Sequence, residues 1–179
     1  MSATGPTVSV VIRPVRTGDA AALRELRLEA LRRNPAAFTA DLAEAQARPI
    51  EWWRELVEKN TGEGVQAIFV AADCNDGRLL GMTGVCGTAA PKQAHRADIW
   101  GVYVRPEARG QGLGDRLVGA ALDWARGRGL LLVTLAVITG NDRARRCYER
   151  AGFTVYGIQP MVVRVDGMFY DEILMVKRL

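Results

Sequence analysis

Apolar residues recur along this chain with two periods, and the changes between the periods predict where helices and strands lie. After Asp19, a good helix N-cap, apolar residues stand three or four apart until Asn34-Pro35 ends the helix. Further helices are expected from about residue 49, from 113 to about 127, and over 142–150. Short apolar runs predict strands at 8–15, 67–72, 79–88, 99–104, 130–137, 153–156 and 169–177.

The order of these elements predicts a mixed α/β sheet in one domain over residues 8–179. Cys74–Gly77 is a hairpin signal, so the strands on either side of it are expected to be antiparallel. Strand–helix–strand–helix order in the second half implies parallel neighbours there. Residues 91–97 are expected to form a polar loop, and residues 1–7 a short disordered lead.

The turn Arg109–Gly114 carries the clearest chemical signal. It follows the apolar run Ile99–Val104 and precedes a helix, an arrangement that places backbone N–H groups and a positive helix end around a phosphate. Its glycines let a diphosphate approach the backbone closely, and Arg109 adds positive charge. A diphosphate site is therefore predicted here, with a turn that binds no ligand as the alternative.

Two common phosphate motifs do not fit this turn. A Walker loop needs Gly-Lys-Ser/Thr, and no Lys follows Gly114. A Rossmann fingerprint needs Gly-x-Gly-x-x-Gly, but its last position falls on Asp115 when read from Gly110 and on Leu117 when read from Gly112.

The pattern that remains, Arg-x-x-Gly-x-Gly, resembles the motif with which GCN5-related N-acetyltransferases (the GNAT family) bind the pyrophosphate of acetyl-coenzyme A. Other segments are similar to the family in the same order along the chain, namely 12–20, 102–107, 141–153 and 166–175. The resemblance implies a GNAT-type mixed, mostly antiparallel central sheet with helices on both faces, parallel and splayed at its two central strands.

The resemblance also implies acetyl-CoA as co-substrate. In the family, the splayed strand pairs with the pantetheine arm through its main chain, and a side chain at the position of Asn141 contacts the arm; a plain helix N-cap is the alternative for Asn141, and it can do both. The implied cofactor-binding residues are Val102, Tyr103, Val104, Arg109, Gly110, Gln111, Gly112, Leu113, Gly114, Asp115, Asn141, Arg145 and Tyr148.

Tyr148 matches the tyrosine that family members use as general acid toward the coenzyme-A sulfur. A phenol with a pKa of about 10 gives its proton to a thiolate of pKa about 8.5 only modestly uphill. The alternative is a tyrosine that closes the core beside Phe153. The neighbouring Cys147 is interpreted as core packing, because the chain has one histidine, His95, and no Cys-His-Asn pattern.

Asp98 is the predicted base that takes the amine proton, through a water. It stands eleven residues before the motif, where several family members place a catalytic glutamate, and an extended strand would put it on one face with Trp100 and Val102. Its rivals are Glu172 and His95, and an exposed carboxylate at a strand start is the alternative without function.

An acetyl thioester is already activated, so the resemblance implies direct transfer to a primary amine in a ternary complex, with a small-molecule acceptor expected first. A protein N-terminus or lysine is the alternative acceptor. A non-catalytic CoA-binding regulator is the alternative of another class, against which the presence of Asp98 and Tyr148 speaks. Trp52 and Trp53 are either core residues or part of the acceptor wall, and a monomer and a homodimer both stay open.

Composition narrows the remaining classes. The 179 residues are 49% apolar and 25% charged, without a run of 18 apolar residues or a signal-peptide pattern, so no membrane association is expected. Three cysteines without metal spacing predict reduced thiols in the cytoplasm and no metal. The net charge of +4 is dispersed except at Arg143, Arg145 and Arg146, beside the predicted anion site, so a polyanionic cofactor is favoured over nucleic acid.

Overall fold

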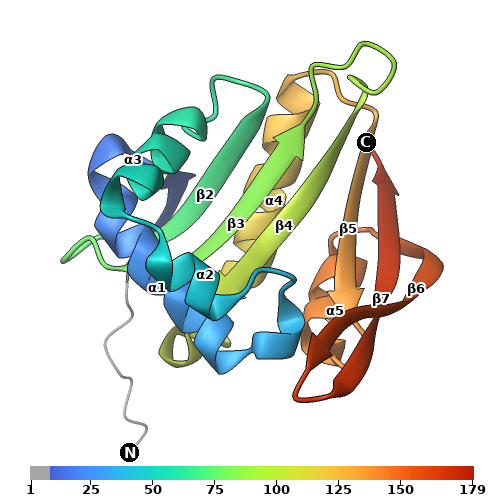
Figure 1. Cartoon of the computed structure of the whole chain (residues 1–179). Coiled ribbons are helices and arrows are strands. Elements are labelled where there is room, and N and C mark those ends of the chain that lie inside the picture. Colours follow the sequence, from blue (N-terminus) through green and yellow to red (C-terminus); the bar gives the residue numbers. More distant parts are fainter. Residues whose placement is uncertain (1–8) are drawn as a thin grey trace, which may run out of the picture.

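The computed structural model describes residues 9–179, which form one seven-stranded sheet with helices on both faces (Figure 1). The expected lead, residues 1–7, lies outside the described residues. The strands are β1 (Val10–Pro14), β2 (Gln66–Asp73), β3 (Leu79–Gly87), β4 (Arg96–Val104), β5 (Leu132–Ile138), β6 (Thr154–Val165) and β7 (Met168–Arg178). The helices are α1 (Ala20–Arg33), α2 (Leu42–Ala47), α3 (Ile50–Lys59), α4 (Leu113–Gly127) and α5 (Asp142–Arg150), with short 3-10 turns at Thr17–Asp19, Pro35–Ala37 and Pro106–Ala108.

The strands lie in the order β1-β2-β3-β4-β5-β7-β6, and only β4 and β5 are parallel. This confirms the expected mixed sheet, but the second half is less parallel than predicted. β7 lies between β5 and β6 and pairs antiparallel with both. Periodicity reports local conformation, and it does not say which strand will pair with which.

The two central strands separate soon after they meet. They pair over three residues, the last pair being Asp98 and Thr134, and diverge beyond it. β4 then contains a bulge, because Gly101 and Val102 together lie opposite the single residue Thr83 of β3. Gly101 has a φ of +66°, which suits a glycine in a bulge. The predicted splayed strands are therefore present, and the bulge bends the strand that borders the opening.

The bulge corrects one expectation about side-chain direction. Trp100 packs against the core under α1 and α3, whereas Val102 packs against the core under α4 and α5. The prediction that Asp98, Trp100 and Val102 share one face is therefore wrong for Val102, because an extra residue in a strand reverses the alternation after it.

The two cores come from helix stripes that the sequence pattern predicts. Leu23 and Leu26 of α1 are buried on one face of the sheet, and Leu117 and Ala121 of α4 on the other. In Figure 1, α1, α2 and α3 lie in front of the sheet and α4 lies behind it. The opening between β4 and β5 is thus bordered by helices of both layers.

Three elements differ from the expected layout. β4 begins at Arg96, inside the expected polar loop, because Arg96 and Asp98 are held by pairing with β5. β6 runs to Val165 instead of ending near 156; it is an edge strand, where Pro160 is tolerated because it needs no ladder hydrogen bond on that side. The short helix α2 was not predicted.

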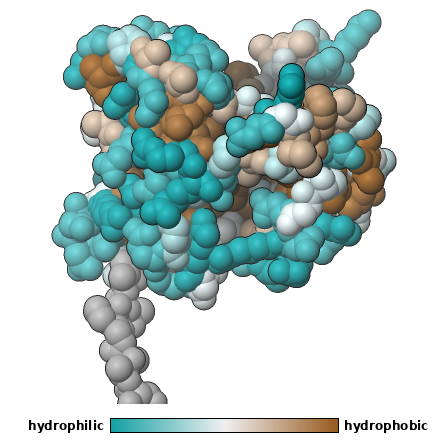
Figure 2. Space-filling view, turned by 60° about the horizontal axis from the view of Figure 1, so that its bottom comes forward, coloured by the Kyte–Doolittle hydropathy of each residue, from teal (hydrophilic) through white to brown (hydrophobic). Residues whose placement is uncertain are grey.

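The outer surface of β6 and β7 carries several exposed apolar side chains, namely Val155, Tyr156, Ile158, Met161, Met168 and Phe169. Figure 2 shows apolar side chains on the right of the molecule, the side on which these strands lie in Figure 1. From residue 9 onward, no helix has the length and apolar character needed to cross a membrane.

Candidate active site

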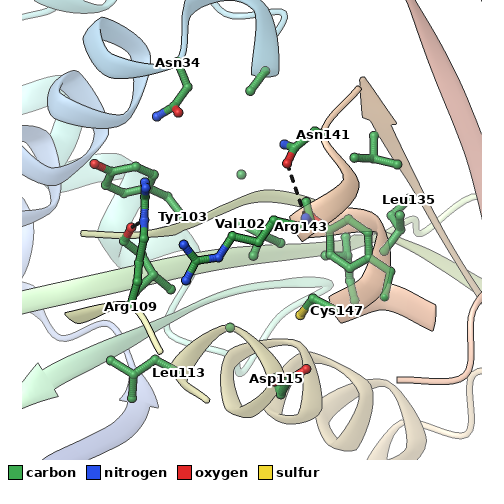
Figure 3. A pocket seen from close by; sticks show the side chains of 18 of the residues that line it. Asn34, Val102, Tyr103, Arg109, Leu113, Asp115, Leu135, Asn141, Arg143 and Cys147 are labelled. Atoms are coloured by element: carbon green, nitrogen blue, oxygen red, sulfur yellow. Dashed lines mark hydrogen bonds between the residues drawn. The ribbon is translucent and has the colours of Figure 1, made fainter. Parts of the chain in front are cut away.

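A cavity of about 540 Å³ fills the opening between β4 and β5. Residues 99–104 of β4 and 135–138 of β5 form two of its walls. The turn before α4, the first turn of α4 and the inner side of α5 form its floor, and Asn34 lies across it (Figure 3). Ala37 and Phe38 also line it. The cavity therefore runs from the α4 layer toward the α1 layer, through the place where the sheet is open.

The glycine turn ends in a helix whose first N–H groups are not capped by a side chain. Gly110 and Gly112 have φ of +83° and +70°, a conformation that other residues adopt only with strain. Gly112 is the N-cap of α4, and it has no side chain to accept a hydrogen bond from the first turn. Those N–H groups, with the positive end of the helix dipole, remain available to an anion.

Two guanidinium groups reach into the cavity beside this helix end. Arg109 donates through Nε to the carbonyl oxygen of Val104 at 3.0 Å and lies 6.0 Å from the ring centre of Tyr103. Arg143, at the start of α5, extends toward the same region (Figure 3). Two cations and an uncapped helix end suit a diphosphate. Arg143 was missed as a site residue, although it belongs to the basic cluster seen in the sequence.

Most of the predicted cofactor-binding residues line this cavity, and two do not. Gln111 is exposed on the turn and lies outside the cavity wall. Arg145 also lies outside it, where its Nε donates to Glu149 at 2.8 Å. The predicted residues that line the cavity are Val102, Tyr103, Val104, Arg109, Gly110, Gly112, Leu113, Gly114, Asp115, Asn141 and Tyr148.

Tyr148 lies on the cavity-facing side of α5 and is buried. Burial raises the pKa of its phenol above the ordinary value, and the neighbouring Cys147 adds to this. Its ring meets that of Phe153 edge-on at 6.4 Å, so the predicted packing contact exists. The hydroxyl makes no hydrogen bond to any residue from 9 to 179, which leaves it free for a ligand.

Cys147 behaves as a core residue. It is buried between α4 and α5, where a Cβ on Gly114 would lie 3.5 Å from its sulfur. Burial, together with the nearby carboxylate of Asp115, raises the pKa of the thiol to about 12. The thiol is therefore protonated at neutral pH, which makes it a poor nucleophile. Cys74 and Cys86 are also free thiols.

Asn141 and Asn34 face the cavity from opposite sides (Figure 3). Asn141 is the N-cap of α5, and its side chain accepts a hydrogen bond from the N–H of Ala144 at 3.3 Å. Asn34, at the end of α1, donates to the carbonyl oxygen of Ala30 at 3.2 Å. The capping role of Asn141 is thus present. Its position in the cavity wall is compatible with the other expected role, a contact to the pantetheine arm.

None of the three candidate bases lies in the cavity wall. Asp98 stands in the last pair before β4 and β5 diverge, and it accepts hydrogen bonds from Thr134 and, at 3.2 Å, from Arg96. Its side chain is 59% exposed. Glu172 of β7 pairs with Ile138, which lines the cavity. Burial raises the pKa of Glu172. His95 is exposed in the loop before β4.

Asp98 and Glu172 nevertheless share one side of the sheet. Ala97 and Ile99, the neighbours of Asp98, pack toward α4, so Asp98 faces the other way. Ile173 also packs toward α4, and the alternation turns Glu172 to the same side as Asp98. Both carboxylates are therefore on the side that α1 partly covers, opposite to the glycine turn.

Trp52 and Trp53 line a second, smaller cavity on that side. Trp53 is buried in the core under α1 and α3, and Trp52 is exposed. Their rings meet edge-on at 5.1 Å. The core role is present for Trp53, whereas the role in an acceptor wall stays a prediction.

Comparison with solved structures gives the same fold. A GNAT-family acetyltransferase from Streptococcus pneumoniae superimposes with a TM-score of 0.84 at 24% identity, covering 96% of this chain and 100% of that one. The protein yncA from Salmonella typhimurium, solved with its cofactor acetyl-CoA, superimposes with a TM-score of 0.82 at 23% identity over 96% of this chain and 94% of that one.

Sequence comparison adds the family. A curated relative from Pseudomonas aeruginosa, an L-methionine sulfoximine/L-methionine sulfone acetyltransferase, is 34% identical over 105 residues, which cover 58% of this chain and 60% of the relative. The match thus spans about three fifths of that relative's length. The model of the acetyltransferase (GNAT) family matches residues 22–153. The resemblance is therefore confirmed, and this chain belongs to the GNAT family of acetyltransferases.

Proposed function

We propose that this chain transfers an acetyl group from acetyl-CoA to the primary amine of a small molecule, by direct attack within a ternary complex. The observation that carries the proposal is the cavity itself. It begins at an uncapped helix end with two arginines, passes between two diverging strands, and reaches the opposite layer of the fold. Such a passage allows donor and acceptor to meet from two sides of the sheet.

The donor end fits the chemistry of coenzyme A. The N–H groups at the start of α4, with Arg109 and Arg143, would bind the diphosphate. Beyond Asp98, the edge of β4 that faces β5 has no strand partner, so its N–H and C=O groups are available to the amides of the pantetheine arm. One of these N–H groups near the bulge would stabilise the oxyanion as the amine attacks.

Tyr148 is proposed to serve the leaving group. The amine nitrogen bonds to the carbonyl carbon, the carbon–sulfur bond breaks with its electron pair on sulfur, and the phenol protonates the thiolate. The raised pKa of Tyr148 keeps the hydroxyl protonated over the neutral range. It also makes full proton transfer more uphill, so the hydrogen bond to the developing thiolate is expected to supply much of the effect.

Asp98 remains the proposed base, acting through a water because it lies outside the cavity wall. Its position beside the point of divergence and on the α1 side of the sheet supports this role. Glu172 is the strongest rival, because it pairs with a residue of the wall and its raised pKa lies closer to neutrality.

The proposal is tested by release of free thiol from acetyl-CoA in the presence of small amines, amino acids and peptides, with binding of acetyl-CoA followed by calorimetry. We expect binding with a 1:1 ratio and amine-dependent thiol release that is greatest with a small amine. Release greatest with peptides would favour a protein acceptor. Binding without release by any amine would favour the non-catalytic regulator.

A further inference from the structure

A second cavity, of about 230 Å³, lies under α1, α2 and α3 on the α1 side of the sheet. Its wall is mostly apolar and includes Trp52, Trp53, Leu56 and Met82. Trp100 of β4 belongs to the walls of both cavities. The second cavity thus adjoins the first where β4 bends, on the side from which an acceptor would approach.

Arg27 of α1 places a cation in this apolar wall without a partner. Among residues 9–179 its guanidinium makes no hydrogen bond and has no carboxylate within 4.0 Å, and its Nη1 is shielded from solvent. The group stacks on the ring of Phe38, which lines the first cavity, at 4.6 Å. Burial lowers the pKa of Arg27 to about 10, so the side chain is still a cation at neutral pH.

Such an arrangement is costly unless something binds there, because a buried charge needs a counter-charge or hydrogen bonds. This fold supplies them elsewhere. Arg105 is buried on the same side of the sheet, and it pairs with Glu25 and Glu29 and donates to the carbonyl oxygen of Leu79 at 2.9 Å. Arg27 is therefore an exception within the same protein.

The wall of the second cavity also contains two carboxylates, and each has a partner other than Arg27. Asp41 caps α2 by accepting the N–H of Glu44 at 2.8 Å. Glu44 in turn pairs with Arg48. A second donor in the wall lacks an acceptor too, since Nε1 of Trp53 is buried without a partner. The cavity thus contains two donors, Nη1 of Arg27 and Nε1 of Trp53, that have no acceptor among residues 9–179.

The position of Arg27 ties this cavity to the proposed chemistry. A Cβ on Gly101 would lie 3.4 Å from its Nη1, so the guanidinium stands next to the bulge of β4. In the proposed function, the thioester lies along β4 in the first cavity. A group bound by Arg27 would therefore lie within a few bonds of the reacting amine.

We propose that Arg27 binds the carboxylate of an amino-acid-like acceptor, with the apolar part of the acceptor in the second cavity and its amine directed toward the bulge of β4. The inference rests on the proposed function and names its substrate class. A planar guanidinium holds a carboxylate by two parallel hydrogen bonds, which fixes orientation as well as position. A peptide N-terminus carries an amide where a free amino acid carries this charge.

The test compares acceptors that differ only in that group. Thiol release is measured with L-methionine and L-methioninamide, and with L-phenylalanine and its amide. The ratio of kcat/KM for acid over amide is then compared between wild type and variants, so that differences in amine basicity cancel. We expect Arg27→Met to lower the ratio at least about 10-fold and Arg27→Lys to retain part of it.

Two controls separate this role from folding and from the donor site. Arg32→Gln removes an exposed arginine of the same helix, and it should leave the ratio unchanged. The Kd of acetyl-CoA, measured by calorimetry, should be the same in all four proteins. Arg27→Met replaces the guanidinium by an apolar side chain, which suits the apolar wall. Thermal unfolding of this variant is compared with that of wild type, to show that its fold is retained.

A binding readout does not depend on turnover. Three of the four tryptophans line the second cavity, so intrinsic fluorescence should change when N-acetyl-L-methionine binds. We expect a saturable change in wild type that is lost in Arg27→Met and kept in Arg32→Gln. Suppose that this acid binds through Arg27 but no amine causes thiol release from acetyl-CoA. That result would support the carboxylate site and contradict the proposed function.

The inference is overturned if amines are acetylated but the acid-to-amide ratio is the same in wild type and Arg27→Met. It is also overturned if N-acetyl-L-methionine quenches both proteins alike. In either case the acetyltransferase activity itself would stand, and Arg27 would be a structural partner of Phe38.

Discussion

At the scale of single residues, the structure separates side chains that act through their position from those that only pack. Tyr148 is suited to both roles, because its ring contacts Phe153 while the residue also lines the cavity. Neither the sequence pattern nor the motif distinguishes these roles. The burial that raises the pKa of the phenol is visible only once α5 is placed against the sheet.

Tyr148→Phe is expected to lower kcat by about 10²–10⁴-fold, the usual contribution of a general acid, with less loss where water takes over the proton. The hydroxyl acts on charge that develops during transfer, so the Kd of acetyl-CoA should hardly change. Stopped thiol-release assays give kcat and calorimetry gives Kd. Full turnover in Tyr148→Phe would mean that this tyrosine only closes the core.

The identity of the base is a second question at this scale. We expect Asp98→Asn to lower kcat/KM and to remove the acidic limb of its pH profile, whereas Glu172→Gln and His95→Gln should keep that limb. A base must be deprotonated to act, so its loss shows as a rate that no longer rises with pH through its pKa. If Asp98→Asn keeps the wild-type kcat/KM and the acidic limb of its pH profile, while Glu172→Gln loses both, the base is Glu172.

At the scale of elements, the glycine turn and the helix after it were predictable, because strand, turn and helix are adjacent in sequence. The cap of α2 also had a signal, since Asp41 and Glu44 have the spacing of a capping box. The bulge of β4 had a weaker one, a glycine inside an apolar run. The insertion of β7 between β5 and β6 had none, because it depends on pairing between distant segments.

Gly112→Val tests the turn. At a φ of +70° a β-branched residue is strained, so the backbone N–H groups that would hold the diphosphate should shift. We expect acetyl-CoA affinity to fall at least about tenfold, or 1.4 kcal/mol. Gly119→Val is the control, because Gly119 lies in the same helix at an ordinary φ with open space at its Cβ. Equal affinities in calorimetry would remove the turn from the donor site.

At the scale of the whole molecule, the site depends on two cores that meet at an open sheet. The class of fold and the glycine turn before α4 followed from the sequence. Arg27, Asn34 and Arg143 did not, because their significance comes from what surrounds them: a missing counter-ion, a place across the cavity, a direction toward the helix end. Such properties exist only in the assembled structure.

Leu117→Ala tests the packing of α4 against the sheet. Leu117 is fully buried between α4 and the sheet, so the change should lower the free energy of unfolding by about 2–5 kcal/mol. Leu131→Ala removes a leucine that is 64% exposed and should cost less than about 0.5 kcal/mol. Urea denaturation measures both, and similar losses would contradict the described core.

Direct transfer in a ternary complex is tested by the initial rate of thiol release, with the concentrations of acetyl-CoA and an amine varied together. Donor and acceptor are proposed to occupy adjoining cavities at the same time, with no acetyl group passing through the protein. For direct transfer, we expect thiol release that requires the amine, with double-reciprocal lines that intersect. Parallel lines would indicate a covalent acetyl-enzyme, and release that is independent of every amine would indicate no transfer; either result would contradict it.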